Sequence, residues 1–423
     1  MATFTSAVFQ NEYLSEGADE VQAVVEITCT DAGSAGAMGT AGEIIIIDTS
    51  GSMDGDRIAA ARKAGVAALQ EIPDGTWFAV IGGSNEARLV YGADHGRWEH
   101  ALVRMDASTR EAAMQAVRGL YAGGGTAIGA WIYAAAYMFT NSEVQQRHAL
   151  LLTDGKNGED DRTLGQHVGF AVGVMQCDCR GVGADWNVPE LRRIAEALLG
   201  SVGLIADPQD MAADFASVMR TAAARGVADA ALRVWVPVGG QVVFVRQVSP
   251  TVEDLTGRGV TVDAVNTDYP TGAWGDETRE YHIGVKVPVQ PLGTTRAVAR
   301  AKLVVGTDAA TDAVITATWS DDAILTTRIA PEVAHYTGQT ALAAAIQEGL
   351  AARASGDETT ATVKLGEAVK LAAETNDDAA TNRLRKVVDV DDETGTVRLK
   401  KKVDELDAMD LDTSSTKTTR VRK

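Results

Sequence analysis

The stretch EIIIIDTSGSM, residues 43–53, joins a run of four isoleucines to a short loop rich in side-chain oxygens. A continuous apolar run of this kind is typical of a strand that is buried on both faces of a sheet. The strand ends at Asp48, and Ser50 and Ser52 follow at every second position. In α/β folds, ligands bind at loops that leave the carboxyl ends of parallel strands. The stretch therefore predicts a central strand followed by a binding loop.

Strand and helix patterns alternate around this stretch, from about residue 40 to residue 226. Strands are predicted at 44–47, 76–83, 148–155, 169–177 and 201–206, and helices at 57–72, 108–120, 126–140, 189–200 and 208–226. Short strands that alternate with helices of this length form a mostly parallel sheet covered on both faces. We therefore expect an α/β fold class, with a Rossmann-like, doubly wound domain over residues 40–226.

The sequence outside residues 40–226 shows a different pattern of predicted strands and helices. Val-rich segments with few helix patterns predict an antiparallel β-sandwich over residues 227–330. Residues 1–35 also contain strand patterns but no partner strand of their own, so we expect them to join the later sandwich. The α/β domain is then inserted in the sandwich or, in the simpler arrangement, followed by it. Residues 331–388 predict a small helical bundle, and residues 389–423 predict a mostly flexible C-terminal tail.

Composition and charge limit the classes of function. The chain has 423 residues, which is long enough for two or three domains, and 58 acidic against 39 basic residues give a formal net charge of −19. Such a charge repels a phosphate backbone and disfavours nucleic-acid binding. Residues 1–10 lack the features of a secretory signal, and no apolar run is long enough to span a membrane. With only Cys29, Cys177 and Cys179, the chain is expected to be cytoplasmic.

Two further segments place oxygen side chains at predicted strand or helix ends. Thr126 follows three glycines, 123–125, at the start of a predicted helix, and Asp154 ends the predicted strand HALLLTDG. Together with Asp48, Ser50 and Ser52, these residues make a hard, oxygen-only donor set that suits Mg²⁺ or Mn²⁺. The alternative is an ordinary turn in which Asp and Ser side chains cap the next helix.

This set resembles the metal-ion-dependent adhesion site of the von Willebrand factor A family. The D-x-S-x-S motif of the family matches Asp48, Ser50 and Ser52, and its distant Thr and Asp match Thr126 and Asp154. The layout of the whole chain also resembles actinobacterial members of the family that carry a β-sandwich and a helical C-terminus. The resemblance implies that Ser50, Ser52 and Thr126 would bind the ion directly and that the two aspartates would act partly through water. It further implies that a carboxylate from an Asp or Glu of a partner protein would take an open position on the ion.

The function expected from this resemblance is a non-enzymatic, Mg²⁺-dependent protein-binding module in a bacterial intracellular assembly or signalling pathway. One alternative is an accessory subunit of an AAA+ ATPase machine, similar to the family members that work in metal chelatases. A metal-dependent phosphohydrolase is disfavoured, because no base or nucleophile stands near the motif in the sequence. The sequence leaves the partner, the oligomeric state and the ion itself open.

Two smaller features complete the set of candidates. Cys177 and Cys179 are separated by one residue and have no second pair, which argues against a zinc site. Threonines near the basic C-terminus are candidates for phosphorylation, which would create a charged epitope for a partner. The candidates are Thr416, Thr418 and Thr419.

Overall fold

The computed structural model describes residues 2–32, 41–93, 98–391, 396–418 and 420. The chain divides into two compact units. The inserted unit comprises residues 31–228 and 272–275, and the outer unit comprises residues 2–30, 229–271 and 276–423. The inserted unit thus interrupts the outer unit in the sequence, which is the first of the two arrangements expected above.

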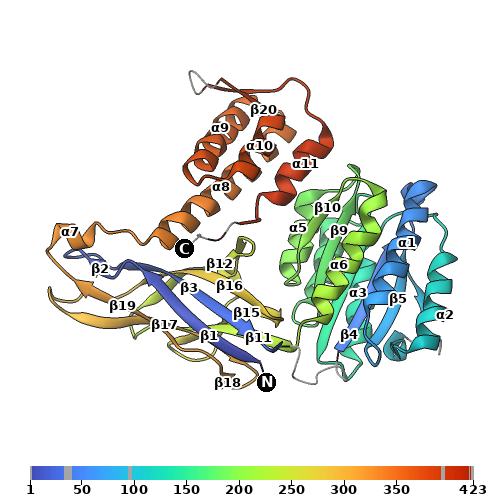
Figure 1. Ribbon diagram of the computed structural model, residues 1–423, viewed down its shortest axis with the longest axis horizontal. Helices are drawn as coiled ribbons and strands as arrows, with labels where there is room; N and C mark the ends of the chain where they lie inside the picture. Colours follow the sequence, from blue (N-terminus) through green and yellow to red (C-terminus); the bar gives the residue numbers. More distant parts are fainter. Residues whose placement is uncertain (1, 33–40, 94–97, 392–395, 419, 421–423) are drawn as a thin grey trace. The chain divides into compact units, whose positions relative to one another are not determined.

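The inserted unit is built on a mostly parallel sheet with the strand order β10-β9-β8-β4-β5-β6 (Figure 1). The pairs from β10 to β5 are parallel, whereas β6 and the short β7 both pair with β5 in antiparallel fashion. The strands are β4 (Ala41–Asp48), β5 (Trp77–Gly83), β6 (Ala87–Tyr91), β7 (Val103–Arg104), β8 (Gln146–Thr153), β9 (Gln176–Val182) and β10 (Val202–Ile205).

Helices cover both faces of this sheet. On one face, α1 packs beside α2 and α6, and on the other, α3 packs beside α4. The α-helices are α1 (Asp56–Glu71), α2 (Ala107–Arg118), α3 (Ile128–Thr140), α4 (Asp161–Ala171), α5 (Val188–Ala197) and α6 (Met211–Ala223). This doubly wound arrangement agrees with the prediction from the sequence. Strands buried on both faces need apolar residues at every position, and the isoleucine run of β4 meets that requirement.

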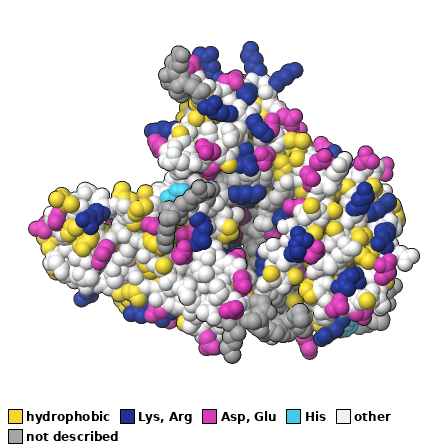
Figure 2. Space-filling model, in the orientation of Figure 1, with side chains coloured by type: hydrophobic (Ala, Val, Ile, Leu, Met, Phe, Trp, Pro, Cys, Tyr) yellow, Lys and Arg dark blue, Asp and Glu magenta, His cyan; other side chains and the backbone are white. Residues whose placement is uncertain are grey.

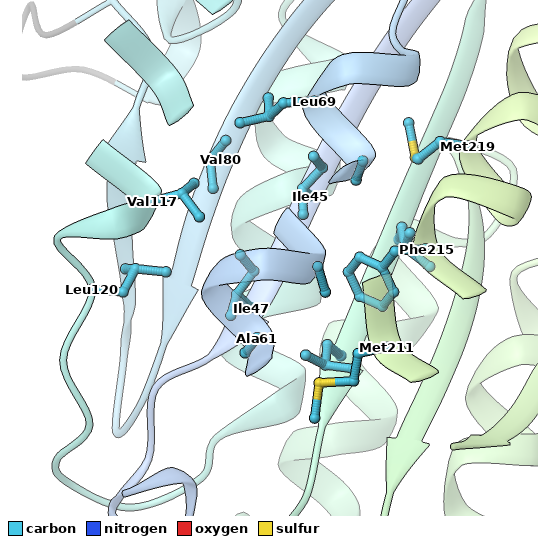
Figure 3. Packing of buried hydrophobic residues seen from close by; sticks show 14 of the residues in the cluster. Ile45, Ile47, Ala61, Leu69, Val80, Val117, Leu120, Met211, Phe215 and Met219 are labelled. Atoms are coloured by element: carbon cyan, nitrogen blue, oxygen red, sulfur yellow. The ribbon is translucent and has the colours of Figure 1, made fainter. Parts of the chain in front are cut away.

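The isoleucine run of β4 lies in the middle of the core. All four isoleucines are fully buried. Ile45 and Ile47 belong to a cluster with apolar residues of α1, α2 and α6, as Figure 3 shows for Leu69, Val117 and Phe215. Because successive side chains of a strand point to opposite faces, Ile44 and Ile46 face the other layer of helices. The run therefore anchors β4 rigidly below the loop that begins at Asp48.

The predicted strand at 169–177 is wrong except for its last two residues, 176 and 177. Residues 169–171 complete α4, in which Leu164, Val168 and Ala171 are buried at helical spacing. The helix stops before Gly173, which adopts the left-handed conformation with φ of 73°. Strand β9 begins only at Gln176. The apolar run contained the end of a helix and the start of a strand, which periodicity alone does not separate.

The outer unit contains two sheets that pack against each other through β1 and β3 on one side and β17 and β19 on the other. The first has the order β1-β3-β16-β12-β13 and the second the order β14-β15-β11-β17-β19-β2, with β18 beside β17. The pair β19 and β2 is parallel. The antiparallel pairs are β1–β3, β3–β16, β16–β12, β12–β13, β14–β15, β11–β17, β17–β19 and β17–β18. The longer strands are β1 (Thr3–Gln10), β3 (Glu20–Thr30), β11 (Val227–Trp235), β12 (Gln241–Ser249), β15 (Asn266–Trp274), β16 (Glu277–Lys286), β17 (Thr295–Val305) and β19 (Ala313–Trp319); the short ones are β2 (Tyr13–Leu14), β13 (Glu253–Asp254), β14 (Val260–Thr261) and β18 (Asp308–Ala309).

Helices follow the sandwich within the outer unit. After the single turn α7 (Ala323–Thr326), α8 (Pro331–Ala354) and α9 (Glu358–Glu374) pack side by side, and α10 (Asp378–Val387) packs on α9. The first turns of α8 lie on the sandwich, where Val333 and Tyr336 cluster with Val24 and Val248. A two-stranded hairpin of β20 (Val388–Val390) and β21 (Val397–Leu399) comes next.

The prediction of a mostly flexible tail over 389–423 is wrong for much of its described part. Besides the hairpin, the segment forms helix α11 (Glu405–Ser414), whose N-terminus is capped by the Asp404 side chain through the Leu406 amide. Leu411 is buried in the core of the helical region, and Met409 and Thr413 are also buried. The polar composition concealed these buried positions, because a short amphipathic helix needs few apolar residues to pack on a neighbour.

Charge is distributed rather than concentrated on the one face of the surface that Figure 2 shows. On the face shown in Figure 2, acidic and basic side chains lie interspersed over both units. Among the described residues, none of the helices is both apolar enough and long enough for a membrane span.

Candidate metal centre

The predicted donor residues lie in loops at one edge of the inserted sheet. Asp48 is the last residue of β4, and Asp154 directly follows β8, the parallel strand beside it. Ser50 and Ser52 lie in the loop after β4, which makes a short 3₁₀ turn over Gly51–Met53. Parallel neighbours end at the same edge, so the ends of the two strands meet although Asp48 and Thr153 are 105 positions apart in the sequence.

Asp48 is completely buried, and both of its carboxylate oxygens accept hydrogen bonds. Oδ1 accepts from the backbone amide of Ser50 at 2.7 Å, and Oδ2 accepts from the Thr153 hydroxyl at 2.6 Å. Burial raises the pKa of Asp48 to about 6, although these hydrogen bonds act in the opposite direction. The nearby charge of Asp154 adds to the rise. A cation placed here would relieve this unfavourable burial of negative charge.

A chain of oxygens leads from Ser50 to Asp154. The hydroxyls of Ser50 and Ser52 lie 3.0 Å apart, and the Ser52 hydroxyl donates to Asp154 Oδ1 at 2.6 Å. Asp154 and Ser50 are buried, whereas Ser52 is exposed. The buried aspartates and Ser50 therefore lie next to Ser52, which reaches solvent.

Thr126 completes the group from a different loop. A Cβ atom built on Gly155 would lie 3.2 Å from the Thr126 hydroxyl oxygen and 3.3 Å from that of Ser52. The two hydroxyls thus face the same small space next to Gly155, which a side chain would begin to fill. The structure brings Asp48, Ser50, Ser52, Thr126 and Asp154 together.

Backbone hydrogen bonds fix the glycine loop against the serine loop. The Gly51 amide donates to Gly124 O at 2.9 Å, and the Gly123 amide donates to Thr49 O at 2.7 Å. Gly124 has a φ of 88°, a conformation that a residue with a side chain rarely adopts. The side chain of Asn85 accepts from the Gly125 amide at 2.6 Å. These contacts set the position of Thr126 relative to the two serines.

Side chains after β8 hold the start of α3. Asn157 Oδ1 accepts from the Ile128 amide at 3.0 Å, and Glu159 Oε2 accepts from the Gly129 amide at 2.5 Å. The Gly158 amide donates to Thr126 O at 2.7 Å. Sequence reasoning missed Asn157 and Glu159, because such contacts depend on the approach of two loops and carry no motif.

Arg57 is the other site residue that sequence reasoning missed. It lies in the first turn of α1, and its guanidinium donates to Asp154 Oδ2 at 2.6 Å and to Asp185 Oδ2 at 3.0 Å. Its position five residues after Ser52 was the available signal, because the helix that follows the serine loop must start beside the site.

The donor set fits a hard divalent cation. It consists of hydroxyl and carboxylate oxygens, the ligands that Mg²⁺ and Mn²⁺ prefer, and the space beside Gly155 has hydroxyls from two loops on its border. Nowhere in the described part of the chain are three His, Cys, Asp or Glu side chains grouped to hold a metal ion, so the candidate site depends on its hydroxyl oxygens as well as its two carboxylates. Ser50, Ser52 and Thr126 offer neutral oxygens, and Asp48 and Asp154 offer the negative charge.

Cys177 and Cys179 lie on β9 and are buried. The hydrogen bond with Cys179 and burial hold the pKa of the Cys177 thiol well above its usual value. A metal-binding cysteine must be a thiolate, so this environment disfavours zinc, in agreement with the sequence argument.

Two of the candidate threonines for phosphorylation, Thr416 and Thr418, make hydrogen bonds to the edge of the sandwich. The Thr418 hydroxyl donates to Val248 O at 2.6 Å, and Thr416 O accepts from the Val252 amide at 2.7 Å. Thr419 is outside the described residues. Phosphorylation of Thr418 would have to displace the segment from the edge of the sandwich, because its hydroxyl is already engaged.

Comparisons with known proteins identify relatives of both the inserted unit and the whole chain. Residues 43–202 match the family described as the von Willebrand factor type A domain, and residues 370–415 match the von Willebrand factor type A C-terminal domain. A solved structure described as von Willebrand factor type A from Catenulispora acidiphila is 44% identical, with a TM-score of 0.94. The alignment covers 99% of this chain and 97% of that one.

Two more distant matches share the fold or part of the sequence. The ArnB paralog VWA2 from Sulfolobus acidocaldarius shares the fold over 98% of each chain, with 16% identity and a TM-score of 0.60. An uncharacterized protein of Synechocystis sp. is 28% identical over 224 residues. This chain spans about half the length of that curated relative, since the match covers 49% of it.

Proposed function

Because the chain belongs to the von Willebrand factor type A family, we propose that its five clustered residues form a metal-ion-dependent adhesion site. In this proposal, Ser50, Ser52 and Thr126 hold Mg²⁺ or Mn²⁺ directly, and Asp48 and Asp154 complete the shell partly through water. The protein is then a metal-dependent binding module and not an enzyme. A bound cation would supply an open, positively charged position for a carboxylate of a partner protein.

One observation carries the proposal: hydroxyls from two separate loops border the space next to Gly155. The Cβ position of Gly155 lies 3.2 Å from the Thr126 hydroxyl and 3.3 Å from the Ser52 hydroxyl. An ordinary helix-capping turn needs no such convergence, because each cap serves only its own helix. The alternative that Asp48 and the serines cap α1 also lacks support, since the N-cap of α1 is Gly55 and no side chain bonds to it there.

The protein side chains have separate tasks in the proposed binding. The buried Asp48 and Asp154 attract the cation, and their hydrogen bonds hold them in place. The neutral hydroxyls of Ser50, Ser52 and Thr126 add no further negative charge, so the site keeps a positive potential toward solvent. An acidic side chain of the partner is therefore the expected ligand.

Affinity capture from the native cell lysate tests this function. Wild-type protein is immobilised and exposed to lysate once in Mg²⁺ and once in EDTA. The Asp48→Ala, Ser50→Ala double variant is exposed to lysate in Mg²⁺. The matched control is Asp54→Ala, which removes an exposed acidic residue just beyond the serine loop. We expect a partner that is retained by wild type and the control in Mg²⁺ and is released by EDTA and by the double variant.

Equal capture in all four samples would contradict the proposed function. Mutation of acidic residues in the captured protein then tests the ligand chemistry, since replacing the contacting Asp or Glu by its amide should abolish retention. An ATPase among the retained proteins would favour the second expectation from the sequence, an accessory role in an ATPase machine.

A further inference from the structure

Asp154 forms an ion pair with Arg57 of the same chain. Its Oδ2 accepts from the guanidinium of Arg57 at 2.6 Å, while its Oδ1 accepts from the Ser52 hydroxyl at 2.6 Å. The Asp154 side chain is fully buried, and that of Arg57 is 32% exposed. Both oxygens of a proposed metal-site carboxylate are therefore engaged by the protein.

Arg57 is held from its other side by Asp185. The second terminal nitrogen of the guanidinium lies 3.0 Å from Asp185 Oδ2, and the Asp185 side chain is 65% exposed. One arginine thus links a buried carboxylate to a surface carboxylate. Because Asp185 retains Arg57 beside the site, the guanidinium stays close to it even if Asp154 turns toward another cation.

We infer that Arg57 is the resident counter-charge of the metal-free site and that its positive charge weakens the binding of a divalent cation. This inference rests on the proposed adhesion site. Without Arg57, Asp154 would lose its paired cation while it lies buried near a second carboxylate, that of Asp48, which is costly. With Arg57, the site is partly neutralised, and an incoming ion meets a positive charge that already occupies part of its ligand set.

The size of the effect follows from Coulomb's law. A divalent ion and a guanidinium that share one carboxylate are separated by roughly 6 Å, and partial exposure implies a high effective dielectric. The repulsion then weakens metal binding by about tenfold. Arg57 would in this way set the ion concentration at which the site fills, so that partner binding follows the metal level.

Three substitutions separate charge from geometry. Arg57→Gln removes the positive charge but keeps a side-chain hydrogen-bond donor for Asp154. Arg57→Lys keeps the positive charge. Arg57→Met also removes the charge and replaces Arg57→Gln if that variant does not fold. The matched control is Arg110→Met, because Arg110 forms a comparable ion pair of 2.7 Å with Asp74 elsewhere in the inserted unit. The measurements are calorimetric titration of the metal-free proteins with Mn²⁺ and their melting temperatures without metal.

We expect Arg57→Gln to bind Mn²⁺ about tenfold more tightly than wild type and to melt at a lower temperature without metal. Arg57→Lys and Arg110→Met should bind Mn²⁺ with an affinity within about threefold of wild type. If wild type binds Mn²⁺ and the charge-free variants bind it equally or more weakly, the inference about Arg57 is overturned while the adhesion site remains. If wild type binds no Mn²⁺, the proposed function fails and the inference fails with it.

Discussion

At Asp48 the chain leaves the buried strand β4 and enters the loop that carries Ser50 and Ser52. The sequence was sufficient to select all five oxygen donors, because each one follows a recognisable strand or glycine pattern. It was not sufficient to find Arg57, Asn85 or Glu159. The contacts of Asn85 and Glu159 arise from loops that meet only in three dimensions. For Arg57, the one available signal was its place at the start of the helix that follows the serine loop.

Substitution of Gly155 tests how closely the Thr126 and Ser52 hydroxyls must approach each other to bind the ion. We predict that Gly155→Ala weakens Mn²⁺ binding by roughly tenfold, because the new methyl group would lie 3.2 Å from the Thr126 hydroxyl and 3.3 Å from that of Ser52. The hydroxyls would have to move apart by a few tenths of an ångström. Calorimetric titration measures the affinity, and circular dichroism shows whether the fold is retained.

Gly165→Ala is the matched control for this change. Gly165 lies within α4, and no atom lies within 4 Å of its Cβ position. Its substitution should leave Mn²⁺ binding unchanged and slightly stabilise the helix, by up to about 1 kcal/mol. Unaltered metal affinity in Gly155→Ala would show that the space beside Gly155 is not where the ion binds.

Three adjacent strands of the inserted unit are connected by a buried row of charged side chains. His148 on β8 lies 2.6 Å from Glu43 on β4 through Nδ1 and 3.0 Å from Asp178 on β9 through Nε2. Burial disfavours the charged imidazole, but the two carboxylates prevail and raise the pKa of His148 to about 9. For Asp178, burial is likewise outweighed, chiefly by the hydrogen bond and charge of His148, so its pKa is lowered.

This row predicts a loss of stability at alkaline pH. The pKa of His148 is higher in the folded chain than its ordinary value of 6.5, so protonation stabilises the fold. The contribution is complete below about pH 6.5, is lost as the pH rises through about 9, and amounts to roughly 3 kcal/mol. Chemical unfolding between pH 6 and 10 measures the decline.

Histidine NMR gives the direct check on this assignment. We expect one imidazole resonance, assigned through His148→Gln, to remain in the protonated form well above pH 7. A His148 resonance that titrates near pH 6.5 would refute the charged row. His167, which is partly exposed beside Glu159, provides an internal comparison.

The C-terminal segment forms a second link between elements, within the outer unit. Arg420 lies 3.2 Å from Glu280 on β16 and 3.0 Å from Glu26 on β3, and Glu280 also accepts a hydrogen bond from the Tyr336 hydroxyl. The Glu280 side chain is 5% exposed, so it depends on these partners for compensation. The segment after α11 is therefore fastened to the sandwich.

We predict that Arg420→Ala lowers the free energy of unfolding by about 1 kcal/mol, the modest value that suits an arginine that is 45% exposed. Urea unfolding measures the change. Arg296→Ala, which removes an exposed arginine of β17, is the control and should change stability by less than about 0.5 kcal/mol. An Arg420→Ala protein as stable as the control would argue that the segment is not fastened in solution.

Elements were predictable from the sequence where the pattern was long and regular, as in β4, α1 and α8. The prediction for residues 169–177 failed because one apolar run spans the end of α4 and the start of β9. The tail prediction failed because α11 buries a few side chains in a polar sequence. In both cases tertiary contacts decided the structure of a segment whose local pattern was ambiguous.

At the scale of the whole molecule, the insertion follows from a strand that pairs across it. The expectation that residues 1–35 contain no partner strand of their own is wrong, because β1 pairs with β3. The N-terminal β3 has its antiparallel partners in β1 and in β16, where Thr28 lies opposite Thr278. The sequence indicated that β3 needed a later partner, because an amphipathic strand must bury its apolar face. It did not indicate which strand, since several Val-rich strands of similar pattern follow the inserted unit. The outer unit thus joins residues 2–30 to strands that follow the inserted unit in the sequence.

The central claim is that residues of the inserted unit hold a divalent ion, and titration of the metal-free full-length chain with Mg²⁺ tests it most directly. Wild type and Asp54→Ala should bind one ion per chain with the same affinity. The Asp48→Ala, Ser50→Ala variant should lose at least about a hundredfold in affinity, because it lacks one buried charge and one hydroxyl of the set. Equal Mg²⁺ binding by the double variant and wild type, or no binding by wild type, would contradict the account.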